Sequence, residues 1–463
     1  MSAPAVVAAG RTRPLCRDLA AQARAATIPR ASECLEKIRI CLLDFLTCAL
    51  ESRDLPISVQ AIRFAAQEAG SAPVLFTDHR APVPQAAFVN AVMGHGLVRE
   101  DMHTGSVSHL GVVIWPTLLA LAARRSVSGS TLVEAAILGY EIGGRFGRAI
   151  ISPDFARTFR PTGFTGPIAA ALAGAHLLGL DEEETASALS LAVNTLSGLN
   201  EWPATGSDEM FFHPGFAARN AVTAVELAAF GARASETVLD GAAGFFAAYR
   251  PGKPAPAIRL FPDDLPEILA VYNKPVPACN YAQTPCQAML ALAREEPLRP
   301  EQIEAILVRG TRAMKLYPGC DYAGPFGRIL QAKMSIQFGV AAALVRGGVR
   351  EENYRRLDDP EILGLARRIT VDEDPAFNAA YPARQGAAVD VTLTDGRRLT
   401  RRLEDVVPAT PDGVRARFQE AGGAITGAAR AAAITETVGQ LERLEDLASL
   451  LALLRGSEKG DRI

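Results

Sequence analysis

The sequence lacks several features that would place it at once in a functional class. Its formal net charge is only −3, with 48 Lys and Arg against 51 Asp and Glu, so it has no basic field to attract a nucleic acid. Its longest apolar stretches, such as 168–180, are shorter than the run of about 20 residues that a membrane span needs. We therefore expect neither a nucleic acid nor a membrane as a partner.

The cysteines and the N-terminus also lack a recognisable pattern. The chain has 7 cysteines, an odd number, and none of them forms a Cys-x-x-Cys pair. Such spacing is typical of reduced, buried thiols rather than of disulfides or a zinc site. The N-terminal stretch MSAPAVVAAGRTRPL has no secretory layout. Both observations predict a cytoplasmic protein.

Helical periodicity dominates the first part of the chain, where alternating, strand-like patterns are almost absent before residue 265. Ser130 and Asp181 stand where helix caps are expected. Ala and Gly occupy many positions that larger side chains would normally fill, which favours closely packed helices. The apolar spacing predicts helices at 34–50, 56–70, 83–98, 116–126, 130–150, 164–179, 182–199, 214–231 and 235–248.

A proline-rich stretch at 251–266 marks a boundary. Beyond it, 303–311 and 388–405 alternate like strands, the second with Asp395-Gly396 as a hairpin turn. Helices are predicted between them at 282–294, 328–346 and 358–366, and again in the tail at 411–458. We predict a mostly α protein with a large all-helical domain (1–265 plus 406–463) and a smaller α+β lid domain (266–405), since a chain this long exceeds one ordinary core.

The stretch HGLVREDMHTGSVSH, from His95 to His109, holds three of the six histidines. His95, His103 and His109 are separated by eight and six residues, which matches no common metal-binding spacing, so we expect no metal. Any one of them could simply satisfy a polar helix end. Three imidazoles beside Glu100 and Asp101 favour proton transfer, because histidine titrates near neutral pH.

Five blocks of sequence carry a family resemblance: NAVMGHGLVREDMH…SH (90–109), LVEAAILGYEIGGRFGRAI (132–150), FRPTGFTGPIAAALAGAHLLGLDEEETASALSLA (159–192), HPGFAARNAVTAVELAAFG (213–231) and NKPVPACNYAQTPCQAMLAL (273–292). Together they resemble the MmgE/PrpD family, and the resemblance covers nearly the whole chain. It implies a helical domain, built from the N-terminal part and the C-terminal tail, with a smaller α+β lid. It also implies a homodimer through the helical domain and a reaction that removes a proton next to a carboxylate or carbonyl without a cofactor.

The resemblance also implies which residues line a pocket. The family's first block matches at His95, Glu100, Asp101, His103 and His109. Residues that are polar or differently charged in the family's pattern are replaced here by Val98, Met102, Arg160 and Met210, and Leu110 replaces a proline. One wall should therefore be more apolar than in the family's dehydratases, which favours a less charged or bulkier substrate.

Other candidates come from the remaining blocks. Lys274 opens the family's Lys-x-x-Pro segment, and Cys279 and Tyr281 follow it. Tyr322 lies near a pocket tyrosine of the family, whereas Arg160 precedes a glycine-rich helix start where it could bind a carboxylate. His213 precedes a helix that begins at Pro214. Each has an ordinary alternative, namely a surface charge, a buried thiol, a packed ring or a helix cap.

These residues together predict a cofactor-independent lyase, dehydratase-like, acting on a small organic acid. We expect His103 or His109 to be the base, with Asp101 and Lys274 as further catalytic groups. His95, Arg160, His213, Cys279, Tyr281 and Tyr322 are expected to bind substrate. An epimerase or isomerase that returns the proton, a decarboxylase, and a degenerate metabolite binder remain the alternatives.

Overall fold

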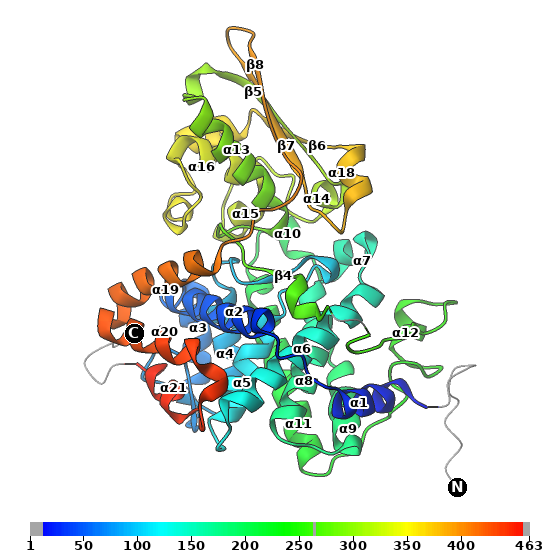
Figure 1. Cartoon of the computed structure of the whole chain (residues 1–463). Coiled ribbons are helices and arrows are strands. Elements are labelled where there is room, and N and C mark those ends of the chain that lie inside the picture. The colour runs from blue at the N-terminus through cyan, green and yellow to red at the C-terminus, as the bar shows by residue number, and fades with distance from the viewer. Residues whose placement is uncertain (1–12, 263–264, 457–463) are drawn as a thin grey trace.

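The computed structural model describes residues 13–262 and 265–456, and it divides visibly into two parts. A large body of helices forms the base of the molecule in Figure 1, and a smaller part containing a sheet stands above it. The mostly α fold with a smaller α+β region is thereby confirmed. Residues 1–12, which carry most of the N-terminal stretch without a secretory layout, lie outside the described residues.

The helical part is built around α8, whose residues are almost all buried and which packs against α5, α6, α9 and α11. Two short strands, β1 (Ala72–Pro73) and β2 (Arg80–Ala81), pair with each other and contact α4. The helices of this part are α1 (Leu15–Ala25), α2 (Ser32–Glu51), α3 (Pro56–Ala65), α4 (Val83–His95), α5 (Gly111–Ala122), α6 (Gly129–Ile150), α7 (Pro153–Thr158), α8 (Pro161–Leu177), α9 (Glu182–Val193), α10 (Trp202–Thr205), α11 (Glu209–Ala229) and α12 (Phe245–Tyr249).

Small residues let these helices approach closely, as the composition predicts. A Cβ atom placed on Gly143 of α6 would lie 3.0 Å from the Cβ of Ala169 on α8. One placed on Gly166 of α8 would lie 2.8 Å from a methyl group of Val113 on α5. Glycine at these crossings therefore sets the distance between α8 and its neighbours.

The smaller part is a four-stranded sheet with the order β6-β5-β7-β8. β5 pairs with β6 in parallel and with β7 antiparallel, and β7 and β8 form the expected hairpin around Asp395-Gly396. α13 packs against β7 and β8 and is itself covered by α16. The strands are β5 (Ile303–Gly310), β6 (Ile369–Glu373), β7 (Ala387–Leu393) and β8 (Arg398–Leu403), and the helices are α13 (Gln283–Glu295), α14 (Arg312–Leu316), α15 (Ile329–Met334), α16 (Ile336–Arg346), α17 (Pro360–Ala366) and α18 (Pro375–Ala380).

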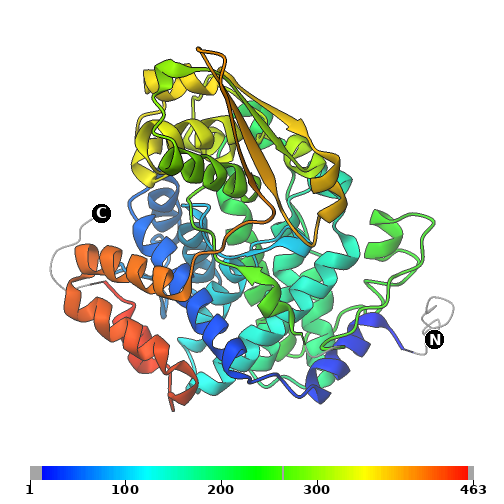
Figure 2. The same ribbon diagram turned by 45° about the horizontal axis from the view of Figure 1, so that its top comes forward.

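The end of the chain returns to the helical part. α19 packs against α2, far away in sequence, and Figures 1 and 2 both show the C-terminal helices beside α2, away from α1. They are α19 (Pro411–Thr426), α20 (Ala428–Gly439) and α21 (Ala448–Leu453). The exact domain limits at 265 and 405 stay predictions.

Several predicted helices differ in detail. The helix expected at 235–248 is wrong: glycine-rich turns replace it, and only α12 is helical. The helix expected at 328–346 breaks at Ser335, whose hydroxyl caps α16. Ser128, not Ser130, caps α6. Pro116 and Pro214 lie inside α5 and α11 rather than at their starts.

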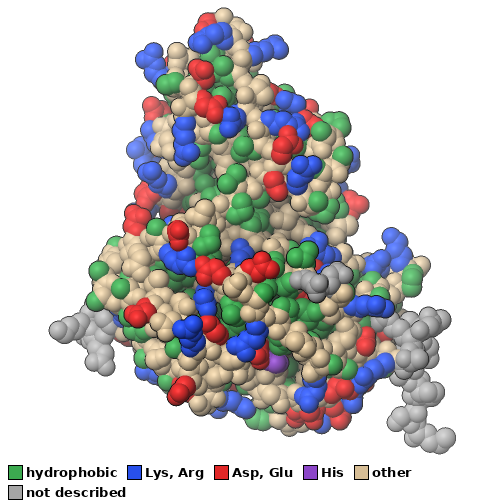
Figure 3. All heavy atoms as spheres, viewed as in Figure 1, with side chains coloured by type: hydrophobic (Ala, Val, Ile, Leu, Met, Phe, Trp, Pro, Cys, Tyr) green, Lys and Arg blue, Asp and Glu red, His purple; other side chains and the backbone are tan. Residues whose placement is uncertain are grey.

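Two surface properties bear on partners. On the face shown in Figure 3, acidic and basic side chains are interspersed over both parts rather than gathered by sign. Among the described residues, none of the helices combines the length and the apolar character that crossing a bilayer requires.

Backbone contacts hold the start of α8 in place. Pro167 has no N–H to donate within the helix, and the Gly163 carbonyl accepts a hydrogen bond from the Ser197 N–H at 3.2 Å. The Arg160 N–H donates in turn to the Gly198 carbonyl at 3.0 Å. The segment after α9 therefore fixes where the Arg160 side chain leaves the backbone.

We predict that Gly163→Ala destabilises the protein by about 1–3 kcal/mol, because a Cβ at this position would lie 1.9 Å from the Ser197 carbonyl oxygen. Urea unfolding measures this change. Gly364→Ala in α17, where no atom lies within 4 Å of the new Cβ, is the control and should be neutral or stabilising. Equal midpoints for the two variants would contradict the close approach.

Candidate active site

A buried cavity lies between the helical part and the α+β part and receives side chains from both. It contains about 290 Å³ of space between atoms, almost all of it too narrow for a water molecule. The surrounding side chains must therefore part to admit an organic acid. The lining residues are Val98, Met102, Val107, His109, Arg160, Met210, Cys279, Asn280, Tyr281, Tyr317 and Met334.

The loop between α4 and α5 forms one wall of this cavity. α4 ends at His95, and the chain turns through residues 96–101 into β3 (Met102–His103). β3 pairs antiparallel with β4 (Val271–Tyr272), the strand that leads into the α+β part. The loop that carries the histidines is thus attached to the segment that joins the two parts.

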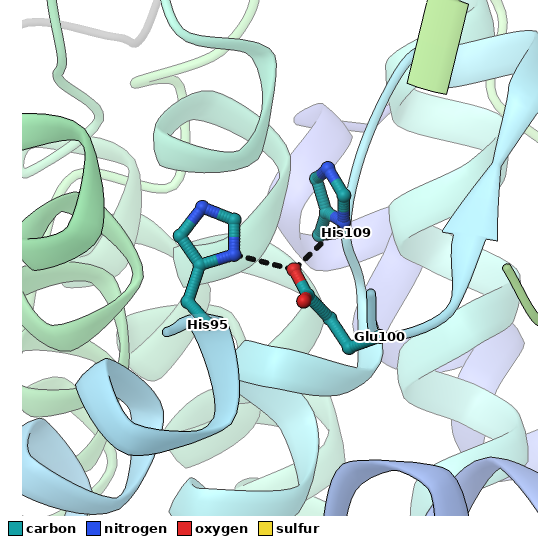
Figure 4. A group of neighbouring side chains, drawn as sticks. All are labelled: His95, Glu100 and His109. Carbon is teal, nitrogen blue, oxygen red and sulfur yellow. Dashed lines mark hydrogen bonds and ion pairs between the residues drawn. The ribbon is translucent and has the colours of Figure 1, made fainter. Parts of the chain in front are cut away.

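Glu100 holds two of these histidines. Figure 4 shows the His95 and His109 rings turned towards one oxygen of the Glu100 carboxylate. His95 Nδ1 is hydrogen bonded to Glu100 Oε1, and His109 Nδ1 lies 2.8 Å from the same atom. All three side chains are buried. His109 is not aligned for a linear hydrogen bond, and its Nδ1 keeps no other partner among the described residues.

The bonding of His95 identifies its tautomer. An Arg160 terminal nitrogen, Nη2, donates to His95 Nε2 at 3.1 Å. Because a guanidinium can only donate, His95 Nε2 must be the acceptor, and its proton lies on Nδ1, facing Glu100. His95 therefore connects Arg160 to Glu100 and has no nitrogen left for a substrate.

Burial sets the charge states of the group. Burial, together with the nearby Lys274 ammonium, lowers the pKa of His109 to about 3. Burial also lowers the pKa of His95. Although burial favours a protonated carboxyl, the two imidazoles hold the pKa of Glu100 well below its usual value. At neutral pH the group is thus an ionised carboxylate between two neutral imidazoles.

Arg160 is the one charged guanidinium or ammonium group among the described residues that line the cavity. It lies at the N-cap position of α8 and is buried. Its Nη1 donates to the Tyr317 hydroxyl at 2.9 Å, while its Nε has no hydrogen-bond partner among the described residues. An unpaired buried donor of this kind suits a carboxylate.

Two buried lysines that do not line the cavity donate hydrogen bonds to backbone carbonyls of the loop that forms its wall. Lys274 Nζ donates to the Val98 carbonyl and lies 3.4 Å from the Ala278 carbonyl. Lys333 Nζ donates to the preceding carbonyl, that of Leu97, at 3.2 Å and pairs with Glu351 at 2.6 Å. Burial lowers the pKa of both ammonium groups. Their contacts hold the loop rather than reach into the cavity.

The same loop contains two strained residues. Val98 has φ 54° and Val107 has φ 50°, and both line the cavity. A β-branched residue in this left-handed region is a conformational outlier that costs roughly 1–3 kcal/mol.

His103 and Asp101 lie outside the cavity lining. His103 Nδ1 accepts from the Ser106 N–H at 3.1 Å, so its Nε2 carries the proton that is donated to Glu267 at 2.6 Å. Asp101 accepts from the Tyr140 hydroxyl and, at 3.1 Å, from the Gly111 N–H at the start of α5. Both side chains are fully engaged, so the structure favours structural roles over the catalytic ones expected for them.

The remaining candidates divide between the cavity and its surroundings. Cys279 and Tyr281 line the cavity, the former with its sulfur 3.4 Å from that of Cys320. Burial is the main reason why the pKa of His213 falls to about 3, and the nearby Arg160 guanidinium also lowers it. Tyr322 points elsewhere: its hydroxyl donates to the Pro325 carbonyl, and it lines a separate hollow beside α10.

Sequence reasoning missed Tyr317 and did not commit to Glu100 as a site residue. Tyr317 follows α14, and it reaches Arg160 across 157 positions of sequence. Its place in KLYPGCDY, five residues before Tyr322, was the available signal.

A metal ion is a geometric possibility for the Glu100 group, because one ligand atom each from His95, Glu100 and His109 lies within 4.8 Å of the others. The neighbouring Arg160 and Lys274 charges oppose a bound cation. The Nδ1 proton of His95, required by its bond from Arg160, already occupies one ligand position. The donor set fits hydrogen bonding better than metal ligation.

Comparison with known proteins identifies relatives for both parts. The MmgE/PrpD N-terminal domain matches residues 17–257, and the MmgE/PrpD C-terminal domain matches residues 276–442. The chain belongs to the MmgE/PrpD family. The resemblance seen in its motifs is thereby confirmed.

Two relatives with assigned reactions span most of both chains. Cis-aconitate decarboxylase of Aspergillus terreus is 26% identical over 456 residues, covering 91% of this chain and 92% of that protein. The 2-methylcitrate dehydratase of Cupriavidus necator is 27% identical over 395 residues, covering 79% of each. Decarboxylation and dehydration are both lyase reactions, and the expectation of a lyase-type MmgE/PrpD enzyme is confirmed at this level.

We predict that the free energy of unfolding falls as the pH is lowered from 7 to 5. Unfolded histidine takes up a proton near pH 6.5, whereas burial keeps His109 neutral down to about pH 3. Each such histidine therefore contributes stability above pH 6.5 that is lost on acidification, at about 1.4 kcal/mol per pH unit. Urea unfolding at several pH values measures the slope. His109→Gln should flatten it by one proton, and an unchanged slope would show that His109 is not held neutral.

Proposed function

We propose that the protein is a cofactor-independent lyase that removes a proton from the carbon next to a carboxylate or carbonyl of a small organic acid. Dehydration is the reaction we favour. The observation that carries the proposal is the neutral, buried imidazole of His109, held against Glu100 on one side of the cavity with Arg160 on the lining as well.

His109 is the proposed base. Its Nδ1 faces Glu100, so Nε2 is the nitrogen left for a substrate bound in the cavity. A neutral imidazole accepts a proton directly, and the neighbouring carboxylate stabilises the imidazolium that forms. His103 is omitted from this role because both of its ring nitrogens are hydrogen bonded.

Arg160 is the proposed carboxylate anchor. Its unpaired Nε–H is available for a carboxylate oxygen, and a charge-assisted hydrogen bond there would orient the substrate. As the proton leaves, negative charge spreads onto the carboxylate, where the guanidinium stabilises it in a cavity without bulk water. Lys274 serves this step indirectly, by holding the Val98 carbonyl.

Tyr317 is the proposed acid. Its hydroxyl oxygen accepts from Arg160, which leaves its own proton free to donate. His109 takes the C–H proton, the electron pair forms the carbon–carbon double bond, and the carbon–oxygen bond breaks. The Tyr317 proton converts the departing hydroxide into water, and the proton on His109 returns through water to restore the tyrosine.

Decarboxylation is the second candidate. Cis-aconitate decarboxylases are among the relatives, and five apolar side chains line the cavity, where a departing carboxylate would lose its hydration: Val98, Met102, Val107, Met210 and Met334. The carbon–carbon bond would break, carbon dioxide would leave, and the electron pair would stay on carbon. Tyr317 would protonate that carbon and regain its proton from solvent. His109 is not the donor because its one proton lies on Nδ1, facing Glu100.

The test is incubation in deuterated water with 3-hydroxybutyrate, malate, citrate and cis-aconitate, followed by mass spectrometry. Loss of water from a hydroxy acid supports dehydration, and loss of carbon dioxide from cis-aconitate supports the second candidate. Deuterium uptake without a new product supports the epimerase alternative. No exchange and no product from any acid would leave only a metabolite binder.

We predict that His109→Gln lowers the rate of the reaction found, or of exchange, by at least about 100-fold, since a positioned base contributes about 10²–10⁴. His176→Gln is the control, because His176 pairs with Glu134 beside a surface hollow remote from the cavity lining. Its rate should match that of the unaltered protein. Equal rates for the two variants would remove His109 from the mechanism.

A further inference from the structure

The charges around the cavity limit how many carboxylates a substrate can carry. Arg160 is the one guanidinium or ammonium group among the described lining residues. The ammonium groups of Lys274 and Lys333 are directed at backbone carbonyls of residues 97 and 98. A second or third carboxylate would be buried without a counter-ion, which is strongly unfavourable.

Five of the other lining side chains are apolar, and the remaining five carry polar atoms. Val98, Met102 and Val107 come from the loop between α4 and α5, and Met210 and Met334 come from α11 and α15. Hydrocarbon is the group that such a surface binds best, since burying apolar area is favourable without directional contacts.

Val98 and Val107 both have a backbone conformation that is unfavourable for valine. Both have the left-handed φ that asparagine or glycine adopts readily and that valine avoids. Lys274 secures the Val98 carbonyl, and the Val107 N–H donates to the Thr104 carbonyl at 3.1 Å. Strain of this kind concentrates at binding sites, and here it directs two branched hydrocarbon side chains at the cavity.

We infer that the substrate is a monocarboxylate with a short hydrocarbon substituent. Arg160 binds the carboxylate, and Val98 and Val107 are the residues that select the substituent. The inference rests on the proposed function for the location of the site. It separates this chain from a site for cis-aconitate or 2-methylcitrate, the compounds in its relatives' names, which carry three carboxylates each.

Calorimetry with unreactive acids tests the charge of the ligand. The probes are 2-methylbutyrate, with one carboxylate and a branched chain, and tricarballylate, with three carboxylates. We expect 2-methylbutyrate to bind at least about tenfold more tightly. Tighter or equal binding of tricarballylate, or no binding of either probe at about 10 mM, would overturn the inference. Because no turnover is needed, this result is independent of the deuterium exchange that tests the proposed reaction.

A pair of variants tests the role of the valines. Val98→Asn and Val107→Asn tolerate the left-handed backbone but replace hydrocarbon with an amide, so they should weaken 2-methylbutyrate binding about tenfold and leave acetate binding unchanged. Phe261→Asn is the control, since Phe261 has φ 47° and lies outside the cavity lining. It should change neither affinity. Unchanged 2-methylbutyrate binding in both valine variants would overturn the assignment.

Discussion

A single buried carboxylate organises the centre of this protein. Glu100 faces the Nδ1 atoms of His95 and His109, and through His95 it is linked to Arg160. An ionised carboxylate at this depth is tolerable because the His95 N–H donates to Oε1 and the His109 ring and the Lys274 ammonium lie near it. The same contact orients His109, while burial and the nearby Lys274 ammonium keep it neutral, so its capacity to accept a proton depends on both.

The two parts of the chain contribute unequally to this centre. The helical part supplies the imidazoles, the carboxylate and the guanidinium, whereas the α+β part supplies Tyr317 and closes the cavity. Lys333 also reaches from α15 to the Leu97 carbonyl, next to the carbonyl held by Lys274. Side chains from the α+β part thus hold the wall of a site whose acid–base groups lie mainly in the helical part.

Local features of the fold were predictable from sequence because their causes are local. Asp181 caps α9 through a reciprocal bond with Glu184, and Asp395-Gly396 forms a hairpin turn, as the residue types predict. The helix predicted at 235–248 does not form over most of that range, because packing does not offset the low helix propensity of its glycines. The site was only partly predictable. The pairing of Arg160 with His95 spans 65 positions, and its contact with Tyr317 spans 157, so no spacing rule could reveal either.

The central claim is that burial keeps His109 a neutral imidazole and that Glu100 orients it with its proton on Nδ1. Nitrogen-15 NMR of the histidine side chains at pH 7, assigned with the His109→Gln variant, measures this most directly. The account predicts a protonated Nδ1 and an unprotonated Nε2 for His109. A proton on Nε2 alone, or an imidazolium at pH 7, would contradict it.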